Sequence, residues 1–130
     1  MLLENKITVI YGAGGSVGGA AARAFAREGA RVFLAGRTRS TLEIVAKDIS
    51  ESGSSADVAE VDALDEQAVG EHVDAVVART GRLDVSFNAV GMDNGDQGIP
   101  LVELSADAYV RPVNEYLRAQ FVTAKAAVRQ

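Results

Sequence analysis

Short apolar runs alternate with longer amphipathic segments along most of the chain. Four runs of about five residues are largely apolar, with many β-branched side chains: residues 7–11, 31–35, 57–61 and 83–87. Near-continuous apolar runs of this length are typical of strands covered on both faces, as in a parallel sheet. We therefore expect four buried strands, of which the third has the weakest pattern.

The segments between these runs have apolar residues at helical spacing. One expected helix covers residues 17–28, a second follows Ser40 and ends near Gly53, and a third runs from Asp65 to Gly81. The resulting order is β-α-β-α-β-α-β, which requires right-handed crossovers. We expect one α/β domain over residues 1–130, with a Rossmann-like, doubly wound parallel sheet.

The last third of the chain is less regular. The polar segment "GMDNGDQGIP" predicts a long loop or a ligand lid. Ser105 is expected to cap a last helix, and Pro112 predicts a kink or a later helix start. An apolar stripe on this helix predicts core or interface: Leu117, Phe121, Ala124 and Val128. No helix-ending residue precedes Gln130, so we expect the chain to stop inside this element.

Composition excludes several classes of protein. Hydrophobic residues make up 48% of the chain, which argues against disorder, and the absence of Cys excludes disulfides and thiolate metal sites. The net charge of −5 argues against nucleic acid as a partner. We find no signal peptide and no apolar run long enough for a membrane helix, so we expect a cytoplasmic protein. His72, the one histidine, is expected on a solvated helix face.

A glycine-rich segment between the first strand and the first helix carries the main functional signal. A P-loop would need a lysine and a hydroxyl residue after Gly19, where two alanines stand. The G-x-G-x-x-G pattern counted from Gly12 fails at Val17. The spacing that remains is Gly12, Ser16 and Gly18, similar to G-x-x-x-G-x-G with serine in the middle place.

A strand, a glycine turn and a helix N-terminus together favour anion binding. Free N–H groups and the positive end of the helix dipole face the same point. Gly12 would make the turn, Gly14 and Gly15 would let the backbone approach a pyrophosphate, and Gly18 would let the helix pack closely. The alternative is a glycine-rich turn without a ligand.

The end of the second strand indicates which dinucleotide would bind. Proteins that bind NAD usually place an acid there, on the ribose 2′-hydroxyl, but here Gly36 takes that place and Arg37 follows. A guanidinium could hold a 2′-phosphate, so we expect NADP, with NAD as the alternative cofactor. The other interpretation is that Arg37 and nearby Arg39 are solvated side chains.

Taken together, these residues resemble the short-chain dehydrogenase/reductase family over nearly the whole chain. The family's T-G-x-x-x-G-x-G reads here from Tyr11 to Gly18, with Tyr11 and Ser16 departing from it. "VDALD" is similar to the adenine-contacting segment after strand three. "NAVG" takes the place of N-N-A-G, keeping the first Asn only. The resemblance implies strand order 3-2-1-4, incomplete on the C-terminal side.

The motifs and the resemblance together imply a set of cofactor-binding residues. They are Gly12, Ala13, Gly14, Gly15, Ser16, Val17, Gly18, Arg37, Thr38, Asp62, Ala63, Asn88, Ala89 and Val90. The resemblance also implies catalysis by a Ser and a Y-x-x-x-K pair, yet no tyrosine has lysine four residues later. Tyr116 stands where the family's catalytic-helix Asn is expected, two residues after Asn114.

The expected function is that of the cofactor-binding part of an NADP-preferring oxidoreductase. The whole family member would transfer hydride between the nicotinamide and a carbonyl or alcohol, which this chain alone should not do efficiently. The alternatives are a non-catalytic NADP-binding or regulatory module and a truncated product without activity. We also expect self-association, because the fourth strand would be an open edge and the last helix would expose its apolar stripe.

Overall fold

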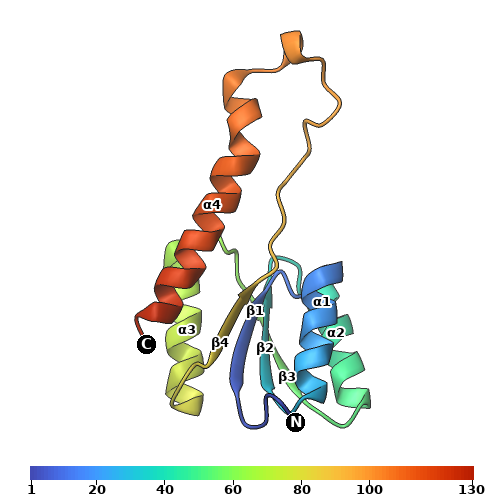
Figure 1. Ribbon diagram of the computed structural model, residues 1–130, viewed down its shortest axis with the longest axis vertical. Helices are drawn as coiled ribbons and strands as arrows, with labels where there is room; N and C mark the ends of the chain where they lie inside the picture. Colours follow the sequence, from blue (N-terminus) through green and yellow to red (C-terminus); the bar gives the residue numbers. More distant parts are fainter.

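A computed structural model describes residues 1–130 and shows one sheet with helices on both faces (Figure 1). The elements are β1 (Ile7–Tyr11), α1 (Ser16–Arg27), β2 (Arg31–Gly36), α2 (Arg39–Glu51), β3 (Ala56–Glu60), α3 (Glu66–Thr80), β4 (Val85–Asn88), a 3-10 turn η1 (Leu101–Glu103) and α4 (Ala106–Val128). The expected alternation of strands and helices is confirmed. The bounds of β1 are the expected ones, and those of the other strands differ from the expected ones by one or two residues.

The four strands are parallel and lie in the order β3-β2-β1-β4, as expected. The chain moves outward from β1 to β3 and then returns to the other side of β1, so the direction of winding reverses between β1 and β4. In this register Tyr11, the last residue of β1, lies between Ala35 of β2 and Asn88 of β4. In open parallel sheets, ligands bind outside the carboxyl ends of the strands at such a reversal.

Two apolar cores cover the two faces of the sheet. On one face, Val9 and Phe33 pack with α3 and α4, and on the other, Ile10 and Leu34 pack with α1 and α2. Neighbouring residues of one strand therefore point into different cores, and both must be apolar. This double burial explains why the central strands read as continuous apolar runs.

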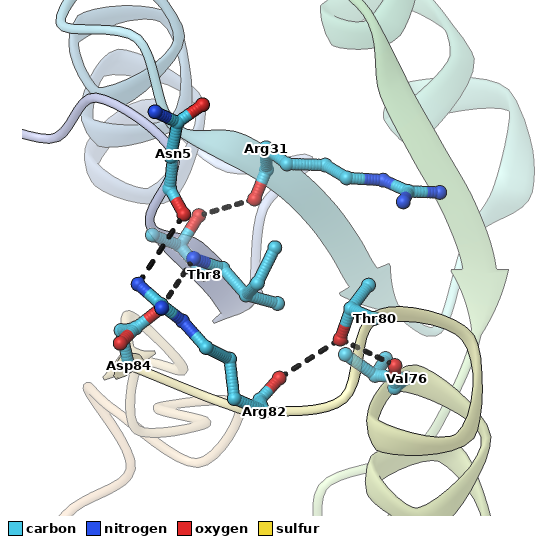
Figure 2. A network of polar contacts seen from close by, with 8 residues as sticks. Asn5, Thr8, Arg31, Val76, Thr80, Arg82 and Asp84 are labelled. Atoms are coloured by element: carbon cyan, nitrogen blue, oxygen red, sulfur yellow. Dashed lines mark hydrogen bonds and ion pairs between the residues drawn. The ribbon is translucent and has the colours of Figure 1, made fainter.

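The amino ends of β1 and β4 are held together by a polar network, shown in Figure 2. The Asp84 carboxylate accepts hydrogen bonds from the Ile7 N–H at 2.8 Å and from Arg82 Nε at 2.9 Å. The bond from the Ile7 amide, followed by the Arg82 guanidinium, lowers the pKa of Asp84. Thr8 is fully buried, and its hydroxyl donates to the Arg31 carbonyl. This end of the sheet is therefore closed by hydrogen bonds within the chain.

α4 departs from the expectation in which face it buries. The helix begins at Ala106, capped by the Ser105 side chain, and continues through Pro112, so a later start is wrong. Its buried residues are Ala119, Val122, Thr123 and Ala126. The stripe of Leu117, Phe121, Ala124 and Val128 is exposed, so its assignment to the core is also wrong. Small residues let α4 lie close to the sheet and α3, which leaves the bulky side chains outside.

The first turns of α4 and the preceding segment extend away from the sheet (Figure 1). This segment is tied to the helix because Arg111 pairs with Asp93 at 3.0 Å and with Asp96 at 3.2 Å. None of the helices combines the length and the apolar character that a bilayer-crossing helix requires.

His72 also departs from the expectation, because it does not lie on a solvated face. It lines a cavity of about 80 Å³ between α3 and β3 with Phe33 and Asp57, and its Nδ1 is buried without a partner. The reason is its place in the helix, one turn from both Val69 and Val76, which form the buried stripe of α3. Burial lowers the pKa of His72.

Candidate nucleotide-binding cleft

A cleft of about 240 Å³ lies at the carboxyl ends of the strands. Each strand or the segment after it contributes residues, and α4 contributes one more. Seven of the residues that the sequence predicted line it: Gly12, Gly15, Arg37, Asp62, Ala63, Ala89 and Val90. Segments far apart in the sequence thus meet where the winding of the sheet reverses.

The other predicted residues do not form the lining of the cleft. They are Ala13, Gly14, Ser16, Val17, Gly18, Thr38 and Asn88. The structure adds residues that sequence reasoning left out: Tyr11, Gly36, Val61, Leu64, Gly91, Asp93 and Glu115. Most of these residues are sequence neighbours of predicted ones, so the motifs that indicated the predicted residues could also have indicated them. On α4 the lining residue is Glu115 and not Tyr116. No motif in the sequence indicated Glu115.

The glycine turn is held by close backbone contacts. Gly12 has a φ of +68°, and a Cβ there would lie 2.8 Å from the Ala89 carbonyl oxygen. A Cβ on Gly18 would collide with the carbonyl of Gly12, so the first turn of α1 rests directly on the turn that precedes it. Gly14 faces α2 instead, because its Cβ would collide with the Thr41 hydroxyl.

The N-terminus of α1 has the features of an anion-binding site. The N–H groups of Ser16, Val17 and Gly18 find no acceptor within the chain. Gly15 occupies the N-cap and provides no side-chain acceptor, and the first turn holds no acid. Unsatisfied N–H groups at the positive end of a helix dipole favour a negatively charged ligand. Ser16 adds an exposed hydroxyl at the same point.

Arg37 is the unpaired cation of the cleft. It follows Gly36 at the end of β2, lines the cleft, and forms no ion pair or hydrogen bond within the chain. Arg39 differs, because it pairs with Glu43 at 3.6 Å along α2. Thr38 occupies the N-cap of α2 without a side-chain capping bond. The start of α2 therefore presents a free guanidinium, a free hydroxyl and a helix N-terminus.

The cleft also contains three carboxylates, two of which pair with one arginine. Arg111 donates to Asp93 at 3.0 Å and lies 3.6 Å from Glu115. The hydrogen bond from Arg111 is the main cause of the lowered pKa of Asp93, and the charge of Arg37 lowers it further. The third, Asp62, accepts a hydrogen bond from the Leu64 N–H at 2.9 Å and keeps its other oxygen free.

Asn88 does not line the cleft, but it holds the backbone segment that does. Its Oδ1 accepts from the Val90 N–H at 2.8 Å, and its Nδ2 donates to the Thr123 hydroxyl at 3.1 Å. Both polar ends of the side chain are thus used within the chain. The residue fixes the course of Ala89 and Val90, which line the cleft.

Tyr11 is the largest side chain that is fully buried. Its hydroxyl finds no hydrogen-bond partner, and burial raises the pKa of Tyr11 to about 12. The phenol is therefore neutral over the whole physiological range. A buried hydroxyl without a partner is unusual, since most such groups are satisfied.

Comparisons with known proteins agree with this geometry. The short chain dehydrogenase family matches residues 6–130. An uncharacterized oxidoreductase of Bacillus subtilis (strain 168) is 33% identical over 123 residues, which are 95% of this chain and 44% of that protein.

Solved structures show the same fold. NAD+-bound xylitol dehydrogenase is 31% identical with a TM-score of 0.87, over 100% of this chain and 49% of that one. A metagenomic short-chain oxidoreductase in complex with NADP is 27% identical with a TM-score of 0.83, over 99% of this chain and 57% of that one.

The chain thus spans about half the length of the curated relatives that it matches. The family match nevertheless covers nearly all of its residues, and the strand order agrees with it. The chain belongs to the short-chain dehydrogenase/reductase family of oxidoreductases.

Proposed function

We propose that this chain binds NADP in preference to NAD and forms the cofactor-binding part of an enzyme that transfers hydride between the nicotinamide and a carbonyl or alcohol. In this arrangement the pyrophosphate lies on the N-terminus of α1, where three N–H groups lack acceptors. The adenine end lies in the cleft near Asp62 and Ala63. When bound, the cofactor supplies hydride chemistry, and these residues hold and orient it.

Arg37 is the observation that carries the preference for NADP. It reaches the cleft from the end of β2, where Gly36 removes the carboxylate that would repel a 2′-phosphate. Arg111 already pairs with Asp93, and Arg37 itself forms no ion pair with an acid of the chain. A free guanidinium beside a helix N-terminus is suited to a phosphate group.

A fluorescence titration with NADPH and NADH, after circular dichroism has confirmed folding, tests this proposal. We expect tighter binding of NADPH, and Arg37→Ala should weaken it by about ten- to a hundredfold, as expected for a lost charge-assisted hydrogen bond. Binding of NADH should change little. Arg39→Ala is the matched control, because that side chain pairs with Glu43. Equal affinity for both nucleotides would contradict the preference.

The alternative function is a non-catalytic NADP-binding or regulatory module. None of the three tyrosines in this chain is followed by lysine at the fourth position, which is compatible with either function because the chain spans about half the length of its relatives. Both proposals predict NADPH binding, and neither predicts carbonyl reduction by this chain alone. Carbonyl reduction by the isolated chain, followed as loss of NADPH absorbance, should be undetectable in either case. Detectable reduction would show that catalysis does not need a Y-x-x-x-K pair.

A further inference from the structure

The Tyr11 hydroxyl stands apart from the other buried hydroxyl groups of the chain. Thr8 donates to the Arg31 carbonyl, and Thr123 donates to the Ala119 carbonyl at 2.8 Å. Tyr11 is only 1% exposed, yet its oxygen has no partner. Burial of a polar group without a hydrogen bond destabilises the folded state. A ligand that supplied the missing bond would recover that free energy.

Tyr11 is also part of the lining of the cleft, so a ligand that shifts the side chains over its buried hydroxyl would reach it. The phenol packs in the core on the side of α3 and α4, together with Val61, Ala63 and Val90, which line the same cleft. The cleft volume of about 240 Å³ is smaller than that of most pockets for whole small molecules, which span roughly 300–1,000 Å³. It is suited to one end of a dinucleotide, and these are the residues that surround it.

We propose that the Tyr11 hydroxyl is a direct contact of this protein for the adenine ring of the bound dinucleotide. The inference rests on the function proposed above, which places adenine beside Asp62 and Ala63. A phenol can donate one hydrogen bond and accept others, whereas adenine offers ring-nitrogen acceptors and an amino donor. Either pairing satisfies the hydroxyl.

Two departures from the family pattern meet at this point of the structure. Tyr11 stands where the family motif has a Thr, and Ala89 stands where it has a second Asn. The Ala89 N–H donates to the Tyr11 carbonyl at 2.9 Å, so the two positions adjoin, and both line the cleft. The longer polar side chain of Tyr11 thus accompanies the loss of a polar side chain at Ala89.

The contact is tested by Tyr11→Phe, which removes the oxygen and keeps the ring. We expect binding of NADPH and of adenosine 2′,5′-bisphosphate to weaken by about three- to tenfold, the effect of one neutral hydrogen bond. Nicotinamide mononucleotide, which lacks adenine, should bind to both proteins equally. The free variant should unfold at the same temperature or higher, because it no longer buries an unpaired hydroxyl.

Tyr109→Phe is the matched control, since Tyr109 is 67% exposed on α4 and does not line the cleft. If the wild-type chain binds NADPH and Tyr11→Phe binds it equally well, the adenine contact is wrong and the proposed function stands. A lower unfolding temperature with unchanged affinity would assign Tyr11 to the core alone. If the wild-type chain binds no dinucleotide, the proposed function fails and this contact fails with it.

Discussion

Asn88 Nδ2 donates a hydrogen bond to Thr123 Oγ1 over 3.1 Å, which joins the end of β4 to the buried face of α4. Thr123 in turn donates to the Ala119 carbonyl one turn earlier in the helix. The other end of the Asn88 amide accepts from the Val90 N–H, in the segment that lines the cleft. One side chain thus couples the position of α4 to the shape of the cleft.

Replacing Asn88 with Ala should lower both stability and nucleotide affinity. The variant loses two hydrogen bonds and leaves the Val90 N–H without its acceptor, so we expect a loss of about 1–3 kcal/mol in the free energy of unfolding. Urea unfolding measures the first effect and NADPH titration the second. Asn114→Ala is the control, because that exposed asparagine makes no hydrogen bond through its side chain. Unchanged unfolding in Asn88→Ala would contradict the coupling.

Two glycines in helices should respond in opposite ways to substitution by alanine. At Gly18 the new methyl group would collide with the backbone of Gly12, so Gly18→Ala should destabilise the chain and displace the turn. At Gly70 in α3 nothing lies within 4 Å of the new atom. Gly70→Ala should therefore stabilise the chain by about 0.5–1 kcal/mol through helix propensity. Thermal unfolding of both variants checks this, and equal effects would contradict the close contact.

The sequence predicted the strands, their order and the glycine turn because each depends on local or periodic information. Residues 7–11 form a strand as expected, since both faces of β1 are buried and every position except Thr8 is apolar or aromatic. Gly12 was identified as the turn residue from its place in the glycine motif directly after the first strand, and its positive φ is one that glycine adopts readily. The position of Arg37 follows from the end of β2, so it too could be read from the chain.

The contribution of α4 could not be predicted, because it depends on tertiary packing. The helix has two adjacent faces with apolar residues, and periodicity does not tell which one meets the sheet. The face with Ala119 and Ala126 is buried, whereas Phe121 is 62% exposed. That choice also decides that Glu115, and not Tyr116, reaches the cleft. His72 lies one turn from Val69 and Val76, so periodicity places it beside the buried stripe of α3, whereas its neighbours on β2 and β3 are distant in sequence.

His72 should make the stability of the chain depend on pH below neutrality. Burial lowers its pKa in the folded state from the usual 6.5, so below about this pH the unfolded chain binds a proton that the folded chain resists. The unfolded state then binds more protons, and the free energy of unfolding falls as the pH drops. His72→Gln should flatten this dependence between about pH 5 and 7. Because His72 is the only histidine, identical urea-unfolding curves for both proteins across this range would contradict the burial.

Tyr11 should destabilise the chain at alkaline pH. Its pKa rises from 10.0 to about 12 on folding, so stability is fully present below pH 10 and is lost as the pH rises from 10 toward 12. The unfolded phenol ionises first, which draws the equilibrium toward unfolding. Two pKa units correspond to about 3 kcal/mol. Tyr11→Phe should remove this loss of stability at alkaline pH. In a titration followed by tyrosinate absorbance, the variant should lack the tyrosine that ionises near pH 12 in the wild-type protein. A wild-type tyrosine titration without a component near pH 12 would contradict the assignment.

The exposed stripe of α4 should drive self-association of this chain. Leu117 is 59% and Phe121 is 62% exposed, and the two lie one turn apart on the same side of the helix. Apolar side chains gathered on one surface favour contact with another apolar surface. We expect the average mass in light scattering to rise with protein concentration, and the double variant Leu117→Glu, Phe121→Glu to keep the mass of a single chain.

Ile44→Glu is the control that distinguishes association through this stripe from association through any exposed apolar side chain. Ile44 is 60% exposed on α2, on the opposite side of the sheet, and it is a single apolar side chain rather than part of a stripe. It should therefore leave the concentration dependence of the mass unchanged. If the Ile44 variant dissociates as fully as the α4 variant, association is nonspecific. If the unmodified chain keeps the mass of one chain at every concentration, the stripe does not drive association in this protein.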